Sequence, residues 1–391
     1  MNLVIFDDPN IRESLLPLTF TRPVAGIRIG ILTIKEKWEA YLNANASIIC
    51  LDYLNKKFST SIQNDNIFIN GAVCPNKNLA DQVKNLPHNT AIMQDGLLLA
   101  FRNSDFDKKW GIEEECNSSA ILIENLWQIF KCNGDQIRSD FKLIVNSRTS
   151  KSINDRHTIV YGEENVFLED GATVKAATIN AEDGPVYLGR NSEVQEGALI
   201  RGPFALCEGS FVNMGAKIRQ DSTVGPYSKV GGEIINSVIQ GYSNKAHDGF
   251  LGNSVIGEWC NIGADSNTSN LKNNYSEVKL WNYPKRKFIK TGEQFCGLIM
   301  GDHSKTGINT MFNTGTVVGV GANIYGSGYP RNFVPSFSWG GASGFTTNKI
   351  SKMLEVAEEV MARRKVKLTD VDRDILNHVY QQTIVYRVWE K

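Results

Sequence analysis

From about residue 166 the hydrophobic positions recur at every sixth residue. The run comprises Leu188, Val194, Ile200, Leu206, Val212, Ile218, Val224 and Val230. The positions two residues earlier are mostly small: Ser192, Ala198, Ser210, Ala216, Ser222 and Ser228. In a left-handed parallel β-helix each hexapeptide forms one flat side of a triangular coil, with the aliphatic side chain inside and a small residue at the corner. An amphipathic helix would repeat at 3.6 residues and an ordinary strand at two. The pattern therefore predicts a left-handed parallel β-helix, which we place at residues 155–345.

The period of six is interrupted twice. It reappears, shifted in phase by two residues, at Phe250, Ile256 and Ile262. It returns again at Met300, Thr306, Phe312, Val318 and Ile324. We therefore expect residues 232–249 and 268–298 to leave the coil as loops or insertions, where a rigid solenoid usually carries its functional groups.

The chain outside the repeat has a different pattern. Residues 2–6 and 66–70 are short apolar runs typical of strands, whereas residues 35–42 and 124–130 have helical spacing. These elements predict a short α/β domain of the Rossmann type at residues 1–150. Residues 346–391 form a helical tail, with Thr369 and Asp372 spaced as a capping box for its second helix. A packing role that caps the solenoid is the expected function of this tail.

Composition narrows the class of protein. The 391 residues carry 42 basic and 42 acidic side chains, so no broad positive field favours a nucleic-acid partner. No run of eighteen apolar residues predicts a membrane span, and the first residues lack the layout of a signal peptide. The seven cysteines are scattered and never spaced CxxC, which favours free thiols over a zinc site or disulfides. We therefore expect a cytoplasmic protein.

One histidine stands out as candidate chemistry. His247 lies in the stretch SNKAHDGFLG, residues 243–252, where the hexapeptide phase breaks, and Lys245 precedes it. A neutral imidazole can accept a proton from an amine or a hydroxyl near pH 7. His247 is thus a candidate general base, with an incidental surface histidine as the alternative. His303, in IMGDHSKTG, is either part of an outward-facing polar turn or a contact to a ligand or a neighbouring subunit.

The segment NKAHDGFLGNSVIGEWCNIGADSNTSNLKNN resembles the acetyltransferase half of the GlmU family, N-acetylglucosamine-1-phosphate uridylyltransferase/glucosamine-1-phosphate acetyltransferase. The resemblance implies that His247 is the base that deprotonates the amine of glucosamine. It implies that Asn261 and Asn270 bind around the sugar phosphate and the acetyl group, and that Arg201 binds the phosphate. It also implies acetyl-CoA as the acyl donor, bound along the outside of the coils, and a homotrimer with each site between subunits.

Two positions near His247 concern the acceptor. Phe250 stands where the family has a tyrosine whose hydroxyl binds phosphate, and Asn236 lies near the place of an expected lysine. Lys245 or Lys272 is a candidate replacement for that lysine. The acceptor sugar therefore stays open, although an amino-sugar 1-phosphate is expected.

The stretch RESLLPLTFTRPVAGIRIG, residues 12–30, is similar to the signature of sugar-1-phosphate nucleotidylyltransferases. The resemblance implies that Arg12, Thr19 and Arg22 bind a nucleotide, that an NTP is a substrate, and that Mg²⁺ assists. Val24 stands where the signature has lysine, and Ala72 where it has a metal-binding aspartate.

The metal ligands of such a site are not identified by the sequence. Asp7, Asp8 and Asp95 are stand-in acids, with surface or capping roles as the alternative for each.

Three functions follow. The first is a GlmU-like transferase whose β-helix acetylates an amino-sugar 1-phosphate, with nucleotidylyl transfer in the N-terminal domain. The second is a nucleotidylyltransferase that uses the β-helix only as an oligomerisation scaffold. The third is a non-catalytic trimeric protein that binds a nucleotide sugar.

Overall fold

The computed structural model describes residues 2–390, and the chain divides into two compact units. Unit 1 comprises the chain up to Arg28 together with Leu32–Asn125. Unit 2 comprises Ile29–Ile31 and the chain from Leu126 onward. The predicted domain boundaries at residues 150 and 345 stay predictions, and each unit is described here by itself.

Unit 1 is an α/β domain around a mixed sheet of six strands in the order β2-β1-β3-β6-β5-β7. The strands are β1 Asn2–Phe6, β2 Ala46–Ile49, β3 Asn66–Asn70, β5 Thr90–Gln94, β6 Leu97–Asn103 and β7 Ile112–Glu115. β1 pairs in parallel with both β2 and β3, and β3 pairs with β6 in antiparallel. A small antiparallel pair joins β4 Val73–Cys74 to β8 Ile121–Leu122. The predicted strands at residues 2–6 and 66–70 are confirmed.

The helices of unit 1 are α1 Pro9–Ser14, α2 Ile34–Leu42, α3 Asp52–Asn55 and α4 Lys77–Lys84. α2 confirms the helix predicted at residues 35–42. Thr33 and Glu36 form a capping box at its N-terminus, and the Trp38 indole donates to the carbonyl of Val73 at 2.8 Å. These contacts fix the helix against the small pair of strands.

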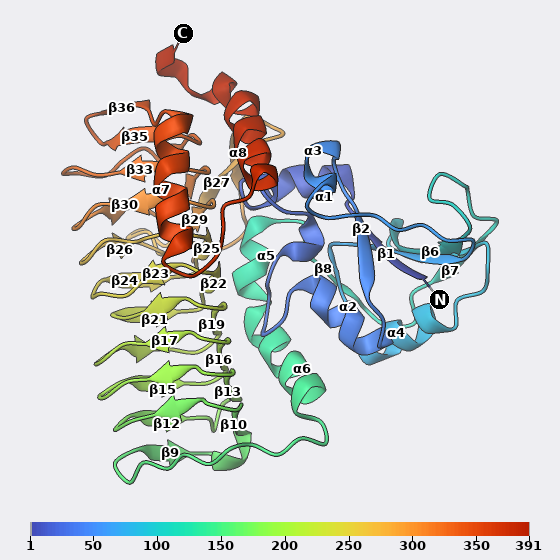
Figure 1. Ribbon diagram of the computed structural model, residues 1–391, viewed down its shortest axis with the longest axis horizontal. Helices are drawn as coiled ribbons and strands as arrows, with labels where there is room; N and C mark the ends of the chain where they lie inside the picture. The colour runs from blue at the N-terminus through green and yellow to red at the C-terminus, as the bar shows by residue number, and fades with distance from the viewer. Residues whose placement is uncertain (1, 391) are drawn as a thin grey trace. The chain divides into compact units, whose positions relative to one another are not determined.

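Unit 2 is a parallel β-helix with three faces (Figure 1). Face I comprises β10 Val166–Leu168, β13 Val186–Leu188, β16 Phe204–Leu206, β19 Ser222–Val224, β22 Val238–Gly241, β25 Val255–Glu258, β29 Leu298–Met300, β32 Thr316–Val318 and β34 Phe333–Val334. Face II comprises β11 Thr173–Val174, β14 Glu193–Val194, β17 Phe211–Val212, β20 Lys229–Val230 and β23 Asn244–Lys245, and it resumes with β30 Lys305–Thr306, β33 Asn323–Ile324, β35 Ser338–Gly341 and β36 Gly344–Thr347. Face III comprises β9 Ile159–Tyr161, β12 Thr178–Asn180, β15 Leu199–Arg201, β18 Lys217–Ile218, β21 Glu233–Ile235 and β24 Phe250–Gly252, followed by β26 Asn267–Thr268 and β31 Met311–Phe312.

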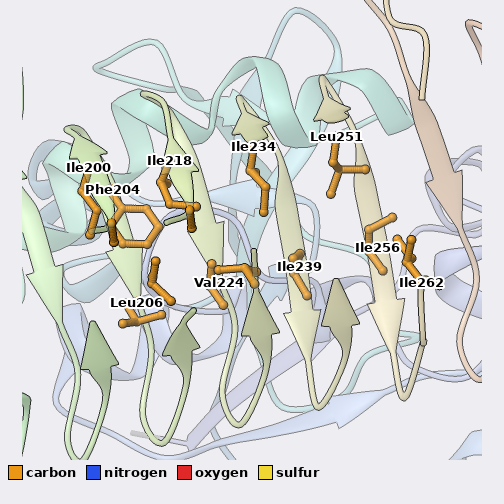
Figure 2. Packing of buried hydrophobic residues seen from close by; sticks show 14 of the residues in the cluster. Ile200, Phe204, Leu206, Ile218, Val224, Ile234, Ile239, Leu251, Ile256 and Ile262 are labelled. Atoms are coloured by element: carbon orange, nitrogen blue, oxygen red, sulfur yellow. The ribbon is translucent and has the colours of Figure 1, made fainter. Parts of the chain in front are cut away.

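The interior of the prism is the predicted hexapeptide core. All eight aliphatic residues of the first run, Leu188 to Val230, are at most 3% exposed, and Figure 2 shows several of them pointing inward from successive coils. The small residues two positions earlier are also buried, at 0–1% exposure. The predicted β-helix is therefore confirmed, because each coil hides its aliphatic residues from water in the way that the period of six requires.

Residues 232–249 do not leave the coil, so this prediction was wrong. Strands β21, β22, β23 and β24 continue the three faces, with Ile234, Ile239, Lys245 and Leu251 at the inward positions. The shift in phase arises because the coil is shortened at its corners: Ile234 follows Val230 by four positions, and Ile239 follows Ile234 by five, where the repeat has six. The expectation that Phe250 points inward was wrong for the same reason, since its neighbour Leu251 is 1% exposed and occupies that place.

The second interruption is an insertion, as predicted. Between β26 and β29 the chain forms an antiparallel hairpin of β27 Lys279–Asn282 and β28 Lys287–Lys290. The inward positions from Met300 to Ile324 then follow the predicted period, each at most 6% exposed.

Two helices and a short upstream segment pack within unit 2. α5 Leu126–Lys131 matches the helix expected near residues 124–130, and α6 Asn133–Val145 follows it. The Asn133 side chain accepts from the backbone amide of Gly30 at 2.7 Å, and Asp140 accepts from the amide of Ile31 at 2.8 Å. The Thr223 hydroxyl on face I donates to the carbonyl of Gly30 at 2.9 Å. Residues 29–31 are therefore held between α6 and the β-helix.

The C-terminal tail forms α7 Ile350–Ala362, α8 Asp370–Gln382 and two short turns, η4 Ile384–Tyr386 and η5 Val388–Glu390. The predicted capping box of Thr369 and Asp372 is present at the start of α8. In α7, Met353 and Met361 are buried, whereas Val356 is 45% exposed, so only part of the apolar side chains of this helix is covered. Arg364 donates to the Asn244 side chain at 2.9 Å, which ties the end of α7 to face II.

Candidate functional site

His247 lies at the corner where the coil turns from face II to face III. β23 ends at Lys245 and β24 begins at Phe250, so residues 246–249 form the corner itself. His247 and Asp248 are exposed there. The imidazole is thus presented to solvent on a backbone that both strands fix, which is the placement that a general base needs.

Lys245 points into the prism, where the repeat places an aliphatic residue. Its side chain is 2% exposed, and its ammonium donates to the carbonyls of Gly231, His247 and Asp248. Burial lowers the pKa of Lys245 to about 8, against the opposing effect of the Asp248 and Asp265 carboxylates. In this position Lys245 holds the backbone of the corner that carries His247.

The other residues predicted for this site lie on different parts of the coil. Asn261 is exposed at the start of face II, where its backbone bridges Asn244 and Lys305. Asn270 follows face III, and its amide donates to the Asn253 side chain at 2.7 Å. Strand spacing puts each about 10 Å or more from the corner of His247. One chain therefore does not bring the three side chains together.

Phe250 lies on the outer surface of face III, partly exposed. Its backbone amide donates to the Asn267 side chain on the next coil at 2.8 Å, and Glu233 is its partner on the preceding coil. Its ring is therefore available to whatever lies against face III beside the corner of His247.

Arg201 is the most distant of the predicted residues. It ends β15, and Arg219, Ile235 and Gly252 take the same place on the next three coils. Three coil spacings amount to about 14 Å along the axis. The guanidinium is exposed and pairs with the Asp183 carboxylate at 3.1 Å. Within one chain Arg201 and His247 are separate.

His303 is part of a column of stacked rings at the corner between faces I and II. Tyr227, Tyr242, Trp259 and His303 follow one another there, with ring centroids 5.3, 4.2 and 6.3 Å apart. All four have positive φ, and His303 is 8% exposed. His303 therefore lies in a turn, as one of the two alternatives expected, but its ring is covered rather than exposed to solvent. The aromatic residues at matching places in successive coils carried a signal for this column, but the shifted phase hid it.

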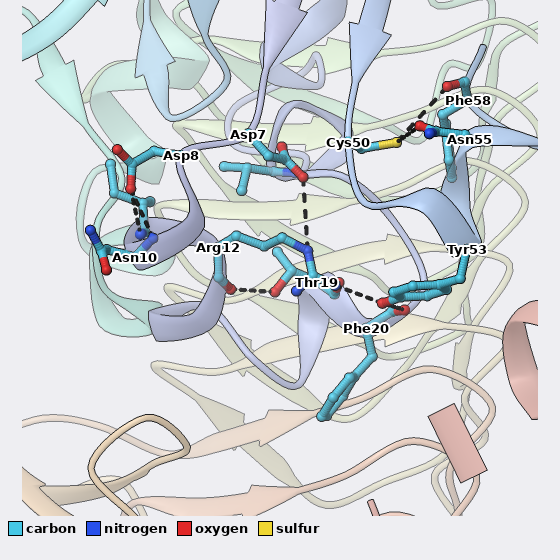
Figure 3. A network of polar contacts seen from close by, with 12 residues as sticks. Asp7, Asp8, Asn10, Arg12, Thr19, Phe20, Cys50, Tyr53, Asn55 and Phe58 are labelled. Carbon is cyan, nitrogen blue, oxygen red and sulfur yellow. Dashed lines mark hydrogen bonds and ion pairs between the residues drawn. The ribbon is translucent and has the colours of Figure 1, made fainter. Parts of the chain in front are cut away.

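Arg12, Thr19 and Arg22, the residues predicted to bind a nucleotide, are buried in unit 1. The Arg12 guanidinium donates to the carbonyl of Thr19 at 2.8 Å and to the Tyr53 hydroxyl at 2.6 Å, and the Thr19 hydroxyl donates to the carbonyl of Arg12 at 2.6 Å. Figure 3 shows these contacts together with Asp7, whose carboxylate lies 3.9 Å from Arg12. The structure thus brings Arg12 and Thr19 together at the carboxyl end of β1, and Tyr53 is a member of the network that the sequence did not indicate.

The three candidate acids of unit 1 occupy different surroundings. Burial raises the pKa of Asp7 to about 7, against a hydrogen bond from the Val24 amide and the charge of Arg12. Asp8 caps α1 by accepting from the amides of Asn10 and Ile11, and Asp95 lies in the turn between β5 and β6.

These surroundings do not fit a magnesium ion. A buried carboxyl with a raised pKa and a capping carboxylate are poor oxygen ligands for Mg²⁺, which prefers charged and partly hydrated sites. Ala72 brings no oxygen ligand of its side chain, and residues 2–390 contain no group of three His, Cys, Asp or Glu side chains that could hold a metal. We therefore derive no step through a metal.

Within residues 2–390, no helix combines the length and apolar character needed to span a bilayer.

Comparisons with known proteins agree with the resemblance predicted from the motifs. Residues 3–149 match the family model described as "Sugar nucleotidyl transferase". The "Bifunctional sugar-1-phosphate nucleotidylyltransferase/acetyltransferase" of Sulfurisphaera tokodaii is 31% identical over 169 residues, 43% of this chain and 40% of that protein. The "Bifunctional protein GlmU" of Methanococcus aeolicus is 31% identical over 156 residues, 39% of this chain and 33% of that protein.

Among solved structures, the "polySia specific acetyltransferase NeuO" covers 54% of this chain and 98% of its own, at 15% identity and a TM-score of 0.27, a likeness too weak to carry an argument. The chain spans 40% or less of the length of these two curated relatives. The predicted resemblance is confirmed over that part: the chain is similar to sugar nucleotidyl transferases over residues 3–149 and, over less than half its length, to the GlmU-type bifunctional proteins.

Proposed function

We propose that the β-helix transfers the acetyl group of acetyl-CoA to the amine of an amino-sugar 1-phosphate, with His247 as general base. The single observation that supports this function most is the placement of His247, exposed at a corner whose backbone is held from inside by Lys245. The hydrogen bonds of Lys245 to the carbonyls of His247 and Asp248 fix the backbone from which the imidazole projects.

The chemistry needs one proton acceptor and one proton donor. The His247 imidazole takes the proton from the sugar amine as the nitrogen attacks the thioester carbonyl, so a C–N bond forms. The C–S bond then breaks, and the imidazolium returns the proton to the departing CoA thiolate. Asn261, Asn270 and Arg201 are proposed to bind the acceptor, with Phe250 forming part of the wall. The proposed acceptor is glucosamine-1-phosphate or a similar sugar.

Because these side chains are spread over separate parts of one chain, the proposed site is completed between subunits of a homotrimer. Each subunit would bring a different part of its coil to one active site. The proposed location of the protein is the cytoplasm, where acetyl-CoA and sugar phosphates are available.

Thiol release from acetyl-CoA in the presence of glucosamine-1-phosphate tests this function. The variant His247→Ala is expected to lose about 10²–10⁴-fold in kcat, the usual contribution of a general base. His157→Ala is the matched control, because His157 is an exposed histidine of the same unit at the other end of the coil. Absence of acetyl transfer to any amino-sugar phosphate would contradict the proposal.

A second candidate function is nucleotidylyl transfer to a sugar-1-phosphate in unit 1, favoured by the family match over residues 3–149. In that case Arg12, Thr19 and Arg22 act at the nucleotide, and the β-helix serves in part as an oligomerisation scaffold. Pyrophosphate release from an NTP and a sugar-1-phosphate measures it. If both activities are absent and a nucleotide sugar raises Tm, the protein is instead a binding protein.

A further inference from the structure

A cavity of about 1230 Å³ lies at the C-terminal end of unit 2. Its walls come from the hairpin β27–β28, from the loops that precede β32 and β34 on face I, and from the turns η4 and η5. We call it the end groove. It lies at the corner between faces III and I, whereas His247 lies at the corner between faces II and III, so it is a separate place on the coil.

The charge of the end groove has one sign. Lys272, Lys279, Arg286 and Arg331 line it, and no aspartate or glutamate does among the described lining residues. The Lys272 ammonium donates a hydrogen bond to the backbone carbonyl of Glu277 at 2.6 Å. Arg286 and Arg331 are exposed, and no carboxylate within residues 2–390 forms an ion pair with either. Guanidinium groups bind phosphate oxygens in pairs, so two exposed arginines that form no ion pair within residues 2–390 suit a phosphate ligand.

Several aromatic rings also line the end groove. The rings of Trp281 and Phe333 stack at 4.2 Å with 11° between their planes, and Tyr386 meets Phe333 edge-on at 5.9 Å. Phe288 packs edge-on against Trp281 at 5.5 Å and is 41% exposed. The stacked pair and Tyr386 fix one another, which leaves Phe288 as the ring most open to a planar ligand.

We propose that the end groove binds a nucleoside phosphate, with the base against the aromatic wall beside Phe288 and the phosphates at Arg286 and Arg331. Aromatic side chains stack on any base, and arginine forks bind phosphate oxygens in pairs. A cavity of about 1230 Å³ has room for a ligand that carries a substituent beyond its phosphates. Two sources share this chemistry: the nucleotide end of coenzyme A and a nucleotide sugar.

Calorimetry with the full chain is the first experiment, with ADP, coenzyme A and UDP-N-acetylglucosamine as ligands and adenosine and inorganic phosphate as partial ligands. We expect saturable binding of at least one complete ligand and much weaker binding of adenosine or phosphate alone. The double variant Arg286→Gln/Arg331→Gln is expected to weaken binding at least tenfold, and Phe288→Leu severalfold. Lys287→Gln is the matched control, because Lys287 is an exposed cation of the same hairpin that does not line the groove.

Because unit 1 is also a candidate for nucleotide binding, the bound ligand must be located. Photolabelling with 8-azido-ADP, followed by peptide mapping, is expected to modify residues 279–288 or 331–345. Labelling confined to residues 3–125 would overturn the proposal, as would unchanged affinity in the folded double variant. The proposal would also be overturned if none of the three complete ligands binds with a Kd below about 1 mM, which is on the order of the weakest specific complexes.

Acetyl-transfer kinetics distinguish the two sources. If coenzyme A occupies the groove, the double variant raises KM for acetyl-CoA at least tenfold and leaves kcat nearly unchanged. If a nucleotide sugar occupies it, that KM stays the same while affinity for UDP-N-acetylglucosamine falls. The binding experiments do not depend on His247. Absence of acetyl transfer would therefore contradict the proposed function, whereas calorimetry and photolabelling alone test nucleoside-phosphate binding in the end groove.

Discussion

At the scale of single residues, Lys245 departs most from the rule of the repeat. The coil hides aliphatic groups, yet here it hides an ammonium that three backbone carbonyls satisfy. A buried charge is unfavourable unless hydrogen bonds compensate it, so such a residue is retained where it specifies a local structure. The local structure here is the corner of His247. The inward position of Lys245 could not be read from the sequence, because it depends on the two shortened corners upstream.

The variant Lys245→Met is expected to lower kcat for acetyl transfer about tenfold while KM for the sugar phosphate changes less than twofold. The reason is that Lys245 acts through the backbone of residues 246–248 rather than on the substrate. Lys305→Met is the control, because Lys305 is a second lysine of face II, in line with Asn244 rather than Lys245, and it donates to the carbonyl of His303 at 3.0 Å, away from the corner. A raised KM with unchanged kcat would show instead that Lys245 contacts the phosphate.

The lowered pKa of Lys245 also predicts how stability depends on pH. The folded protein releases this proton near pH 8, and the unfolded chain near 10.5. Between these values the unfolded state binds more protons, so the contribution of Lys245 to the free energy of unfolding rises with pH by roughly 2 kcal/mol. Hydrogen exchange of the amides of residues 246–249 in the wild type and in Lys245→Met, at pH 7.5 and 9.5, measures this difference.

At the scale of elements, the period of six predicted the β-helix because each side of every coil must bury one aliphatic side chain and place a small residue at the corner. The hairpin β27–β28 was predictable for the same reason, since a long interruption cannot fit inside a coil. The corners were not predictable, because a corner that loses one or two residues still closes the triangle. The motif marked His247 as candidate chemistry, but its placement at a corner within the coil was not predicted, because residues 232–249 were expected to leave the coil as a loop. The separation of Arg201, Asn261 and Asn270 likewise required the register of the faces.

Gly30 gives a second test at this scale. Its φ is +78°, and an added Cβ would lie 2.5 Å from the Asp140 carboxylate and 2.8 Å from the carbonyl of Gln136. Gly292 has a nearly equal φ of +79° and open space around it. Gly292→Ala should therefore cost only the backbone strain of about 1 kcal/mol, and Gly30→Ala about 2–3 kcal/mol more because α6 must move. Urea unfolding of the full chain measures both, and equal costs would contradict the tight packing described for residues 29–31.

At the scale of the whole molecule, two units suggest two separable activities. His247→Ala is expected to leave pyrophosphate release unchanged. Arg12→Gln is expected to reduce that release at least a hundredfold and to leave acetyl transfer within twofold. The loss would follow because Arg12 organises Thr19 and Tyr53 at the end of β1. Parallel assays of both variants check this. Loss of acetyl transfer in folded Arg12→Gln would show that the activities are coupled.

Residues 29–31 have a consequence for the order in which the molecule is completed. Their partners Asn133, Asp140 and Thr223 lie 103, 109 and 193 residues further along the chain. During synthesis the segment therefore leaves the ribosome well before the side chains that bind it, and it must stay available until the coil of Thr223 has formed. A fragment that starts at residue 126 would lack these backbone groups, and Asn133, Asp140 and Thr223 would each lose a hydrogen bond. The β-helix is thus made well after residues 29–31, yet it is completed by this segment from near the beginning of the chain.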